Sequence, residues 1–319
     1  MLISLVCIAL VGAVVLAGMI AFGTKEPPPY LASVGEPFSH VDWSGLPAAQ
    51  TTPARDKTPI TFRVWPAAQP GDPERVVIAI HGSSAHGSSM HPLAKALQAE
   101  GITVYAPDIR GHGATGRRGD IDYAGQLDDD AADFVAMVRA KHPKANLVLL
   151  GFSSGGGYAL HLAGSPLGKS FARAVLISPM LGPRAPTTRG LSNGWAAPFL
   201  PRIIALVILH RIGIHAFDHL PTLAFAIAPG NPGGLTGIYS FLLMQAFGTN
   251  DYAADLRNAA APIAVLVGAN DELFLADQFA PTIHAVRADV PVVIVPDLGH
   301  IQMTTDPRAV PAIVAAVKG

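Results

Sequence analysis

Residues 146–155, Asn-Leu-Val-Leu-Leu-Gly-Phe-Ser-Ser-Gly, hold the serine best placed to do chemistry in this sequence. Positions 147–150 are apolar without polar alternation, which predicts a strand buried on both faces. The next five residues fit G-x-S-x-G around Ser153, and a helical stretch follows two further glycines. A strand, a tight turn and a helix in this order predict a nucleophile elbow. Such a turn holds the serine hydroxyl at a helix N-terminus, where backbone N–H groups favour an oxyanion.

A second interpretation of the same stretch is a glycine-rich loop whose serine only caps the helix, because G-x-S-x-G is short and glycine is common. Ser154 is the rival nucleophile, but the residue two positions before it is Phe152 rather than glycine. A serine hydroxyl is a weak nucleophile at neutral pH and needs a base, which in turn needs an orienting acid. The choice therefore depends on whether such partners occur elsewhere in the chain.

Short apolar stretches alternate with helical stretches, which predicts an α/β fold with a mostly parallel central sheet and helices on both faces. Between residues 181 and 255 the alternation breaks into a proline-containing loop and apolar helical stretches, which predicts a helical cap insertion over the carboxyl edge of the sheet. The predicted strands are 60–65, 75–80, 102–106, 147–150, 174–178, 262–268 and 292–295, the predicted helices are 89–100, 128–141, 158–163 and 307–317, and the cap helices are 203–209 and 238–247.

Chemically useful side chains follow several of these strands. Ser153, Asp271 and His300 each come shortly after a predicted strand, and so does the segment His81-Gly82-Ser83. In an open parallel sheet, catalytic groups collect beyond the carboxyl ends of the strands, so we expect these residues to lie close together. The chain order Ser, Asp, His is the one that α/β-hydrolases use for their triad.

Five motifs together resemble the α/β-hydrolase superfamily, and within it the branch of lysophospholipases, monoacylglycerol lipases and serine aminopeptidase-like hydrolases. The resemblance covers about residues 60–319, apart from the cap. The motifs are Ala79-Ile80-His81-Gly82-Ser83, Asp108-Ile109-Arg110-Gly111-His112-Gly113, Gly151-Phe152-Ser153-Ser154-Gly155-Gly156, Gly268-Ala269-Asn270-Asp271 and Gly299-His300.

The resemblance implies a role for each site residue. Ser153 would be the nucleophile, His300 the general base and then acid, and Asp271 the carboxylate that orients the histidine. The backbone N–H groups of Ser83 and Ser154 would form the oxyanion hole.

Other acids and histidines compete for these roles. Glu272 stands beside Asp271 in the sequence and is the nearest competitor for the role of the orienting acid. We prefer Asp271 to the other acids of the chain because no acid directly follows the strand at 174–178. His300 is one of 12 histidines. We expect His81 and His112, which sit beside glycines, to shape loops through hydrogen bonds. We expect His86 and His91 at the surface or against the cap, and residues 108–113 to form a structural turn.

The N-terminal stretch of residues 2–23 is uncharged and almost wholly apolar. As a helix it would span about 33 Å, enough to cross a bilayer core. A cleaved signal peptide is the competing interpretation, but its basic n-region and a clear A-x-A site are missing. We therefore predict a single-pass membrane anchor over 1–23, a proline-rich tether over 24–58, and a hydrolase domain over 59–319 with the cap at 181–255. The sequence does not indicate on which side of the membrane the domain would lie, because the charges of Lys25 and Glu26 nearly cancel and the positive-inside rule gives no preference.

Composition argues against several classes of partner. A net charge of −1 with no basic block disfavours nucleic acid and a polybasic lipid-surface mode. Cys7 is the single cysteine, so the domain forms no disulfide. Residues 163–170 loosely fit a phosphate loop but run from helix to strand, opposite to the required order. The histidines lack H-E-x-x-H or a close Cys/His cluster, so we expect no catalytic metal and no cofactor.

The resemblance and the apolar cap predict a serine hydrolase that cleaves carboxylic esters of lipid-like or otherwise apolar acyl groups, through an acyl-enzyme on Ser153. The expected partner is a small-molecule ester or lipid, and the oligomeric state stays open. A serine aminopeptidase-like peptidase is the alternative enzyme. Recognition of a free amino terminus would need acids near the pocket, and the cap offers only Asp218, Asp251 and Asp255. A catalytically inactive scaffold used for binding is the alternative of a different class.

Overall fold

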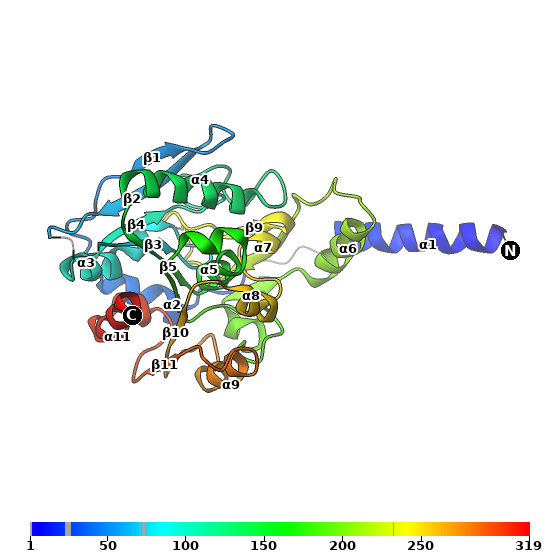
Figure 1. Cartoon of the computed structure of the whole chain (residues 1–319). Coiled ribbons are helices and arrows are strands. Elements are labelled where there is room, and N and C mark those ends of the chain that lie inside the picture. The colour runs from blue at the N-terminus through cyan, green and yellow to red at the C-terminus, as the bar shows by residue number, and fades with distance from the viewer. Residues whose placement is uncertain (1, 23–26, 70, 72–73, 232) are drawn as a thin grey trace.

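The fold is built around one central β-sheet. The computed structural model describes residues 2–22, 27–69, 71, 74–231 and 233–319. Within these residues the sheet has eight strands, and only the pairings β1 with β2 and β2 with β4 are antiparallel. Their order across the sheet is β1 (Gln50–Pro53), β2 (Pro59–Trp65), β4 (Thr103–Pro107), β3 (Arg75–Ile80), β5 (Asn146–Phe152), β6 (Arg173–Ile177), β10 (Ile263–Gly268) and β11 (Val292–Val295) (Figure 1).

Helices cover both faces of this sheet. Successive side chains of a strand point to opposite faces, and β3, β5, β6 and β10 are buried at nearly every position, so neither face is open to solvent. The predicted α/β-hydrolase fold with a mostly parallel sheet is therefore confirmed. The helices are α1 (Leu2–Ala21), α2 (Ala32–Gly35), α3 (His91–Ala99), α4 (Gln126–Lys141), α5 (Ser154–Gly164), α6 (Leu200–Arg211), α7 (Phe241–Ala246), α8 (Tyr252–Asn258), α9 (Phe279–His284), α10 (Gln302–Thr305) and α11 (Val310–Lys318).

Helix α5 begins at Ser154, four residues earlier than predicted, so the glycines lie inside its first turns. A Cβ atom on Gly155 would lie 2.1 Å from the carbonyl oxygen of His81, and one on Gly157 would lie 2.2 Å from that of Met180. Glycine is required at these positions because the helix N-terminus packs directly against backbone beyond the strand ends. The close packing fixes where the serine of the elbow lies.

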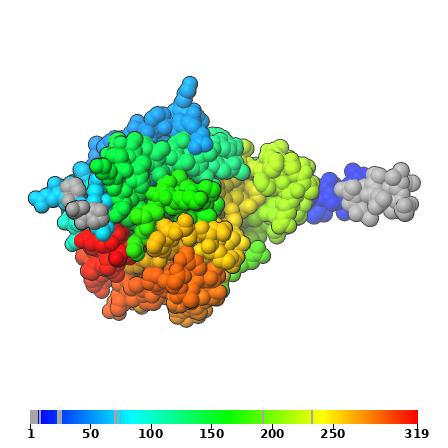
Figure 2. Space-filling view, viewed as in Figure 1, coloured from blue at the N-terminus to red at the C-terminus, as the bar shows by residue number. Residues whose placement is uncertain are grey.

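The cap contains a small antiparallel sheet as well as helices. Strands β7 (Ala196–Pro198), β8 (Pro221–Phe225) and β9 (Ile238–Ser240) pair in that order, beside α6 and α7. Helix α6 agrees with the prediction at 203–209, whereas the predicted helix at 238–247 is wrong in its first residues, which form β9. Strands of three residues are too short to show an alternating pattern, and their hydrogen-bond partners come from distant parts of the sequence. Figure 2 shows residues 200–220 as a projection of the surface beside α1.

The segment predicted as a tether differs in the structure. Residues 24–26 lie outside the described residues, but the rest packs on the hydrolase domain through α2, the 3₁₀ helix Glu36–His40 and the edge strand β1. The amide of Leu31 donates to the carbonyl oxygen of Ala226 in the cap at 3.2 Å, and Val34 is buried. Apolar residues between the prolines give this segment enough surface to bury against the domain.

The N-terminal prediction concerned residues 1–23, of which Met1 and Gly23 lie outside the described residues. Helix α1 packs along α6, where Leu16 and Ile20 contact a buried cluster around Leu206 and Phe241. Taking only the residues that the structure describes, no helix is long and apolar enough to span a membrane. The predicted transmembrane helix is therefore unsupported.

His161 joins the helix that follows the elbow to two neighbours. Its ring lies 3.2 Å from a carboxylate oxygen of Asp128 on α4 and 3.7 Å from one of Asp255 on α8. The hydrogen bond that the ring makes to Asp128, together with the nearby carboxylate of Asp255, raises the pKa of His161 to about 10. A pKa raised in the folded state stabilises the fold fully below the unfolded pKa of about 6.5 and loses this contribution as the pH rises toward about 10.

We predict that His161→Gln destabilises the protein by about 2 kcal/mol at pH 6, a figure reduced for solvent screening of a ring that is one-third exposed. The difference from the unsubstituted protein should shrink steadily between pH 6.5 and pH 10. Urea unfolding across this range measures it. His284→Gln is the matched control, since that ring is bonded to the carbonyl of Val290 rather than to a carboxylate. If the stability difference for His161→Gln were as independent of pH as that of the control, the role given to the contacts with Asp128 and Asp255 would be contradicted.

Candidate active site

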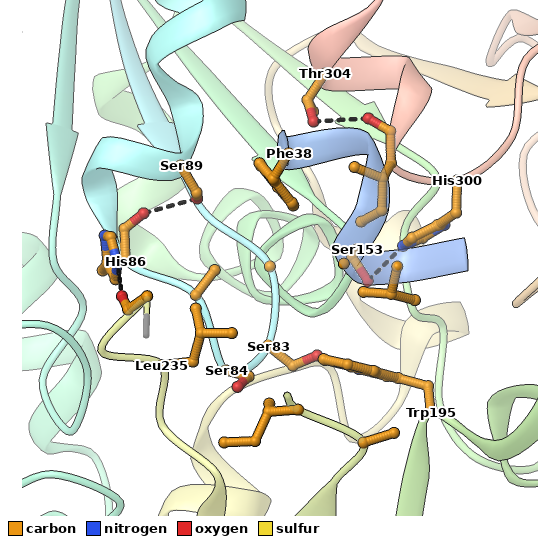
Figure 3. A pocket seen from close by; sticks show the side chains of 18 of the residues that line it. Phe38, Ser83, Ser84, His86, Ser89, Ser153, Trp195, Leu235, His300 and Thr304 are labelled. Carbon is orange, nitrogen blue, oxygen red and sulfur yellow. Dashed lines mark hydrogen bonds between the residues drawn. The ribbon is translucent and has the colours of Figure 1, made fainter. Parts of the chain in front are cut away.

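Ser153, His300 and Asp271 converge at the carboxyl edge of the sheet. Ser153 Oγ lies 2.9 Å from His300 Nε2 (Figure 3). On the other side of the ring, His300 Nδ1 lies 2.8 Å from Asp271 Oδ2. The three residues follow β5, β11 and β10, as the strand-end argument expects, and all three are buried. A chain of contacts from hydroxyl to imidazole to carboxylate can move a proton off the serine.

Ser153 sits in a strained turn. Its φ of 56° and ψ of −122° are unusual for a residue with a side chain. Its amide donates to the carbonyl oxygen of Ile177 at 2.9 Å, and its own carbonyl accepts from Gly157 at 3.0 Å. These bonds tie the turn to β6 on one side and to α5 on the other. The strain is therefore held by the surrounding structure, which presents the hydroxyl to His300.

The carboxylate of Asp271 is arranged to orient the imidazole. Its Oδ1 accepts the amides of Leu273 at 3.0 Å and Phe274 at 2.9 Å, which leaves Oδ2 to His300. Burial acts to raise the pKa of Asp271, but the charge and hydrogen bond of His300, with the amide of Phe274, outweigh it and hold the pKa below its usual value. An ionised carboxylate accepts a hydrogen bond from the N–H at Nδ1. The ring therefore carries its proton on Nδ1, and the lone pair of Nε2 faces the serine.

Glu272, the competing acid, makes a different contact. Its Oε2 accepts the backbone N–H of His300 at 2.8 Å and does not touch the ring. It therefore positions the loop that carries the histidine, and the two neighbouring acids have separate places in the site.

The amides of Ser83 and Ser154 are available to an oxyanion. Ser154 is the first residue of α5, so its N–H has no partner within the helix. In the described part of the chain, neither amide donates to a protein acceptor. A Cβ on Gly82 would lie 3.3 Å from Ser153 Cβ, which places the loop of Ser83 directly against the elbow. The Ser83 hydroxyl also accepts from Trp195 Nε1 at 3.0 Å, so the cap holds this loop.

Behind this loop lies a buried network that the sequence did not reveal. Tyr239, from β9, accepts the amide of Ser84 at 2.7 Å, and its hydroxyl lies 2.5 Å from Nε2 of His112. His81 Nε2 accepts the amide of Ile109 at 3.1 Å. Burial lowers the pKa of His81 to about 4 and that of His112 well below its usual value, so both rings are neutral. Both histidines shape loops through hydrogen bonds, as predicted.

Of the remaining predictions, those for His86 and for the loop at 108–113 agree with the structure, and the surface position expected for His91 does not. His86 contacts the cap through a bond of 3.0 Å between Nε2 and the carbonyl of Gly233, as expected. His91 does not lie at the surface: it is buried, accepts from Trp65 Nε1 at 3.1 Å and stacks on Trp43. The turn at 108–113 has a structural role, because the Asp108 carboxylate accepts hydrogen bonds from the amides of Gly87 and Ala114.

The triad opens into a cavity of about 370 Å³ that is mostly apolar. Part of its wall comes from the segment predicted as a tether, including Val34, Phe38 and Trp43, and part from the cap, including Trp195 and Leu235. Phe38 and Leu235 both border the cavity beside Ser153 in Figure 3. Among the described residues that line it, none is an aspartate or glutamate. The tether residues were missed because proline content pointed to an extended chain.

The strand order, the elbow and the Ser-Asp-His arrangement define an α/β-hydrolase. The chain belongs to the family described as serine aminopeptidase, S33, whose profile matches residues 71–307. This confirms the resemblance to the monoacylglycerol lipase and aminopeptidase-like branch.

Named relatives agree with this placement. The chain is 34% identical over 99 residues to a monoacylglycerol lipase of Mycolicibacterium smegmatis and 31% identical over 121 residues to the monoglyceride lipase of Homo sapiens. These matches take in 31% and 37% of this chain but only 35% and 40% of the relatives. The crystal structure of a monoglyceride lipase variant from Saccharomyces cerevisiae superposes with a TM-score of 0.64 at 18% identity, over 92% of this chain and 97% of the other. At that identity the superposition shows the fold alone.

Proposed function

We propose that this protein is a serine hydrolase that cleaves carboxylic esters of apolar acyl groups through an acyl-enzyme on Ser153. The observation that carries the proposal is the contact chain from Ser153 through His300 to Asp271, at the floor of an apolar cavity. The relatives described as monoacylglycerol lipases support the ester chemistry.

In the first half of the reaction, Ser153 Oγ attacks the ester carbonyl carbon while His300 Nε2 takes the hydroxyl proton. The carbonyl oxygen becomes an oxyanion and accepts the amides of Ser83 and Ser154, a stabilisation worth about 2.7–4 kcal/mol for each donor. The imidazolium then gives its proton to the leaving alkoxide, and the alcohol departs from the acyl-enzyme.

In the second half, water replaces the alcohol. His300 takes a proton from the water as it attacks the acyl carbon, and the same two amides hold the new oxyanion. Collapse of the intermediate releases the carboxylic acid and returns the proton to Ser153. Asp271 stays ionised throughout and stabilises the imidazolium.

The cavity favours an acyl ester over a peptide with a free amino terminus. Its volume of about 370 Å³ suits a small or medium ligand. A protonated amine would need a carboxylate beside it, and the described lining offers none. The acids of the cap, Asp218, Asp251 and Asp255, do not line the cavity. Monoacylglycerols and lysophospholipids are therefore the preferred substrate classes.

Hydrolysis of p-nitrophenyl esters of rising acyl length, monoacylglycerols, lysophospholipids and aminoacyl anilides tests this proposal. We expect kcat/KM to rise from acetyl to a medium acyl chain, and the anilides to react least. A preference for aminoacyl anilides would replace the esterase by a peptidase, and no turnover of any substrate would favour a binding scaffold.

Phe38→Ala tests the acyl pocket itself. Removing a phenyl group that contacts the acyl chain should lower kcat/KM by about tenfold for medium-chain esters, since burial of such a side chain contributes about 1.5–3 kcal/mol. Acetate esters, which are too short to reach it, should change little. Phe217→Ala is the matched control, because Phe217 is exposed and lies outside the lining. An equal loss for acetate and medium-chain esters would contradict an acyl pocket at Phe38.

A further inference from the structure

Two histidines and an aspartate gather in the cap, away from the catalytic cavity. His210 lies in the last turn of α6, and His215 and Asp218 lie in the turn that follows, before β8. None of the three lines the cavity. They belong to residues 200–220, which project from the surface in Figure 2. The side chains of His210 and His215 are 39% and 56% exposed, so both rings are accessible to solvent.

Three atoms of this cluster form an almost regular triangle. His210 Nδ1, His215 Nδ1 and Asp218 Oδ2 are each 3.0 Å from the other two. The rings stand at 84° to each other with centroids 4.4 Å apart, so two separate planes direct a nitrogen toward one point. A cation at the usual zinc–ligand distance of about 2.0–2.2 Å would sit about 1 Å above this triangle and reach all three atoms.

Hydrogen bonds alone satisfy this triangle poorly. Each neutral imidazole carries one ring proton, and a proton on Nδ1 of either histidine can point well at only one of its two neighbours. Two unprotonated Nδ1 atoms at 3.0 Å would repel each other. A cation accepts a lone pair from all three atoms at once and removes this conflict.

Asp218 gives an independent indication. The residue is 2% exposed, and its Oδ1 is buried without a hydrogen-bond partner. Across the described residues, no lysine or arginine pairs with it. A buried carboxylate whose ionic partners are neutral imidazoles keeps an uncompensated charge, and a divalent ion bound between the two histidines would balance it.

We propose that His210, His215 and Asp218 bind one divalent transition-metal ion, with Zn²⁺ as the best fit. Two imidazoles with one carboxylate suit zinc and its neighbours, whereas Mg²⁺ and Ca²⁺ prefer oxygen ligands. The bound ion would fasten the end of α6 to the turn before β8, and so stiffen the cap. The three residues follow a His-x₄-His-x₂-Asp spacing, which is neither H-E-x-x-H nor a Cys/His cluster. The ion would be no part of the triad.

Zinc binding by the full chain without a histidine tag tests the proposal. After removal of metal with a chelator, addition of Zn²⁺ and desalting, we expect one Zn²⁺ per chain by elemental analysis. Co²⁺ added in its place should give the visible spectrum of a nitrogen-ligated site, and Zn²⁺ should raise the melting temperature of the metal-free chain. His215→Ala, at an exposed ring, should fold normally and bind at least about 100-fold more weakly. His210→Ala should do the same.

His219→Ala is the matched control. This ring is adjacent to Asp218 in sequence and 46% exposed, but it pairs with Asp120, so zinc affinity should stay within a few-fold. The proposed site would be overturned if His215→Ala bound zinc as tightly as the unsubstituted chain. It would also be overturned if His219→Ala lost as much zinc affinity as His215→Ala. Asp218→Asn adds a second measurement, and if that variant fails to fold, the two histidine variants still decide.

Discussion

Ser153→Ala should abolish ester hydrolysis, with a fall in kcat of about 10⁶-fold, the size seen when the nucleophile of a serine hydrolase is removed. The variant keeps the amides of Ser83 and Ser154, so a small residual rate over water is expected from binding and oxyanion contacts alone. Initial rates on the best ester of the panel, at high enzyme concentration, measure the effect. Thermal unfolding checks that the fold survives.

Ser154→Ala is the natural control for this variant. Ser154 is the rival serine of the motif, but its contribution to the proposed mechanism comes from its backbone N–H, which alanine retains. We expect activity within a few-fold of the unsubstituted protein. A fall at Ser154→Ala as large as that at Ser153→Ala would contradict the assignment of the nucleophile.

Asp271→Asn should lower kcat by about 10⁴-fold while leaving the fold intact. The asparagine oxygen can still accept the amides of Leu273 and Phe274, so its NH₂ group faces His300 Nδ1. That NH₂ donates a proton and therefore selects the tautomer with the proton on Nε2. A protonated Nε2 cannot take the proton of Ser153, which makes the loss chemical rather than structural.

Glu272→Gln is the matched control beside it. A glutamine oxygen can still accept the backbone N–H of His300, so we expect activity within a few-fold of the unsubstituted protein. The comparison uses kcat on one ester with melting temperature as the check on folding. An Asp271→Asn enzyme that keeps more than a tenth of its rate, or an equal fall in Glu272→Gln, would show that the acid was assigned wrongly.

The central sheet and the triad could be anticipated because their signals are local. Strands buried on both faces appear as continuous apolar runs, as in β3, β5 and β10, and helices between them appear as 3.6-residue periodicity. Ser153, Asp271 and His300 come shortly after such strands, and parallel strands share one carboxyl edge. The fold therefore predicts that they meet, without any knowledge of distances.

The cap and the N-terminal segment could not be anticipated in the same way. Tyr239 reaches Ser84 only because β9 pairs with β8, and three-residue strands carry no period of their own. The predicted tether at 24–58 is rich in proline and small polar residues, and nothing in that composition indicates that Phe38 lines a cavity. His91 looked like a surface residue since its partners, Trp43 and Trp65, lie far away in sequence. Contacts set by tertiary packing decide all three cases.

The most direct test of the account is the site of covalent labelling by a fluorophosphonate. The reagent phosphonylates an activated serine and mimics the tetrahedral intermediate, so it needs the nucleophile, the base and the oxyanion amides together. Intact-mass measurement followed by peptide mapping should find one adduct per chain, on Ser153, and none in Ser153→Ala. An unlabelled protein, or an adduct on another serine, would contradict the claim that Ser153, His300 and Asp271 form a working triad.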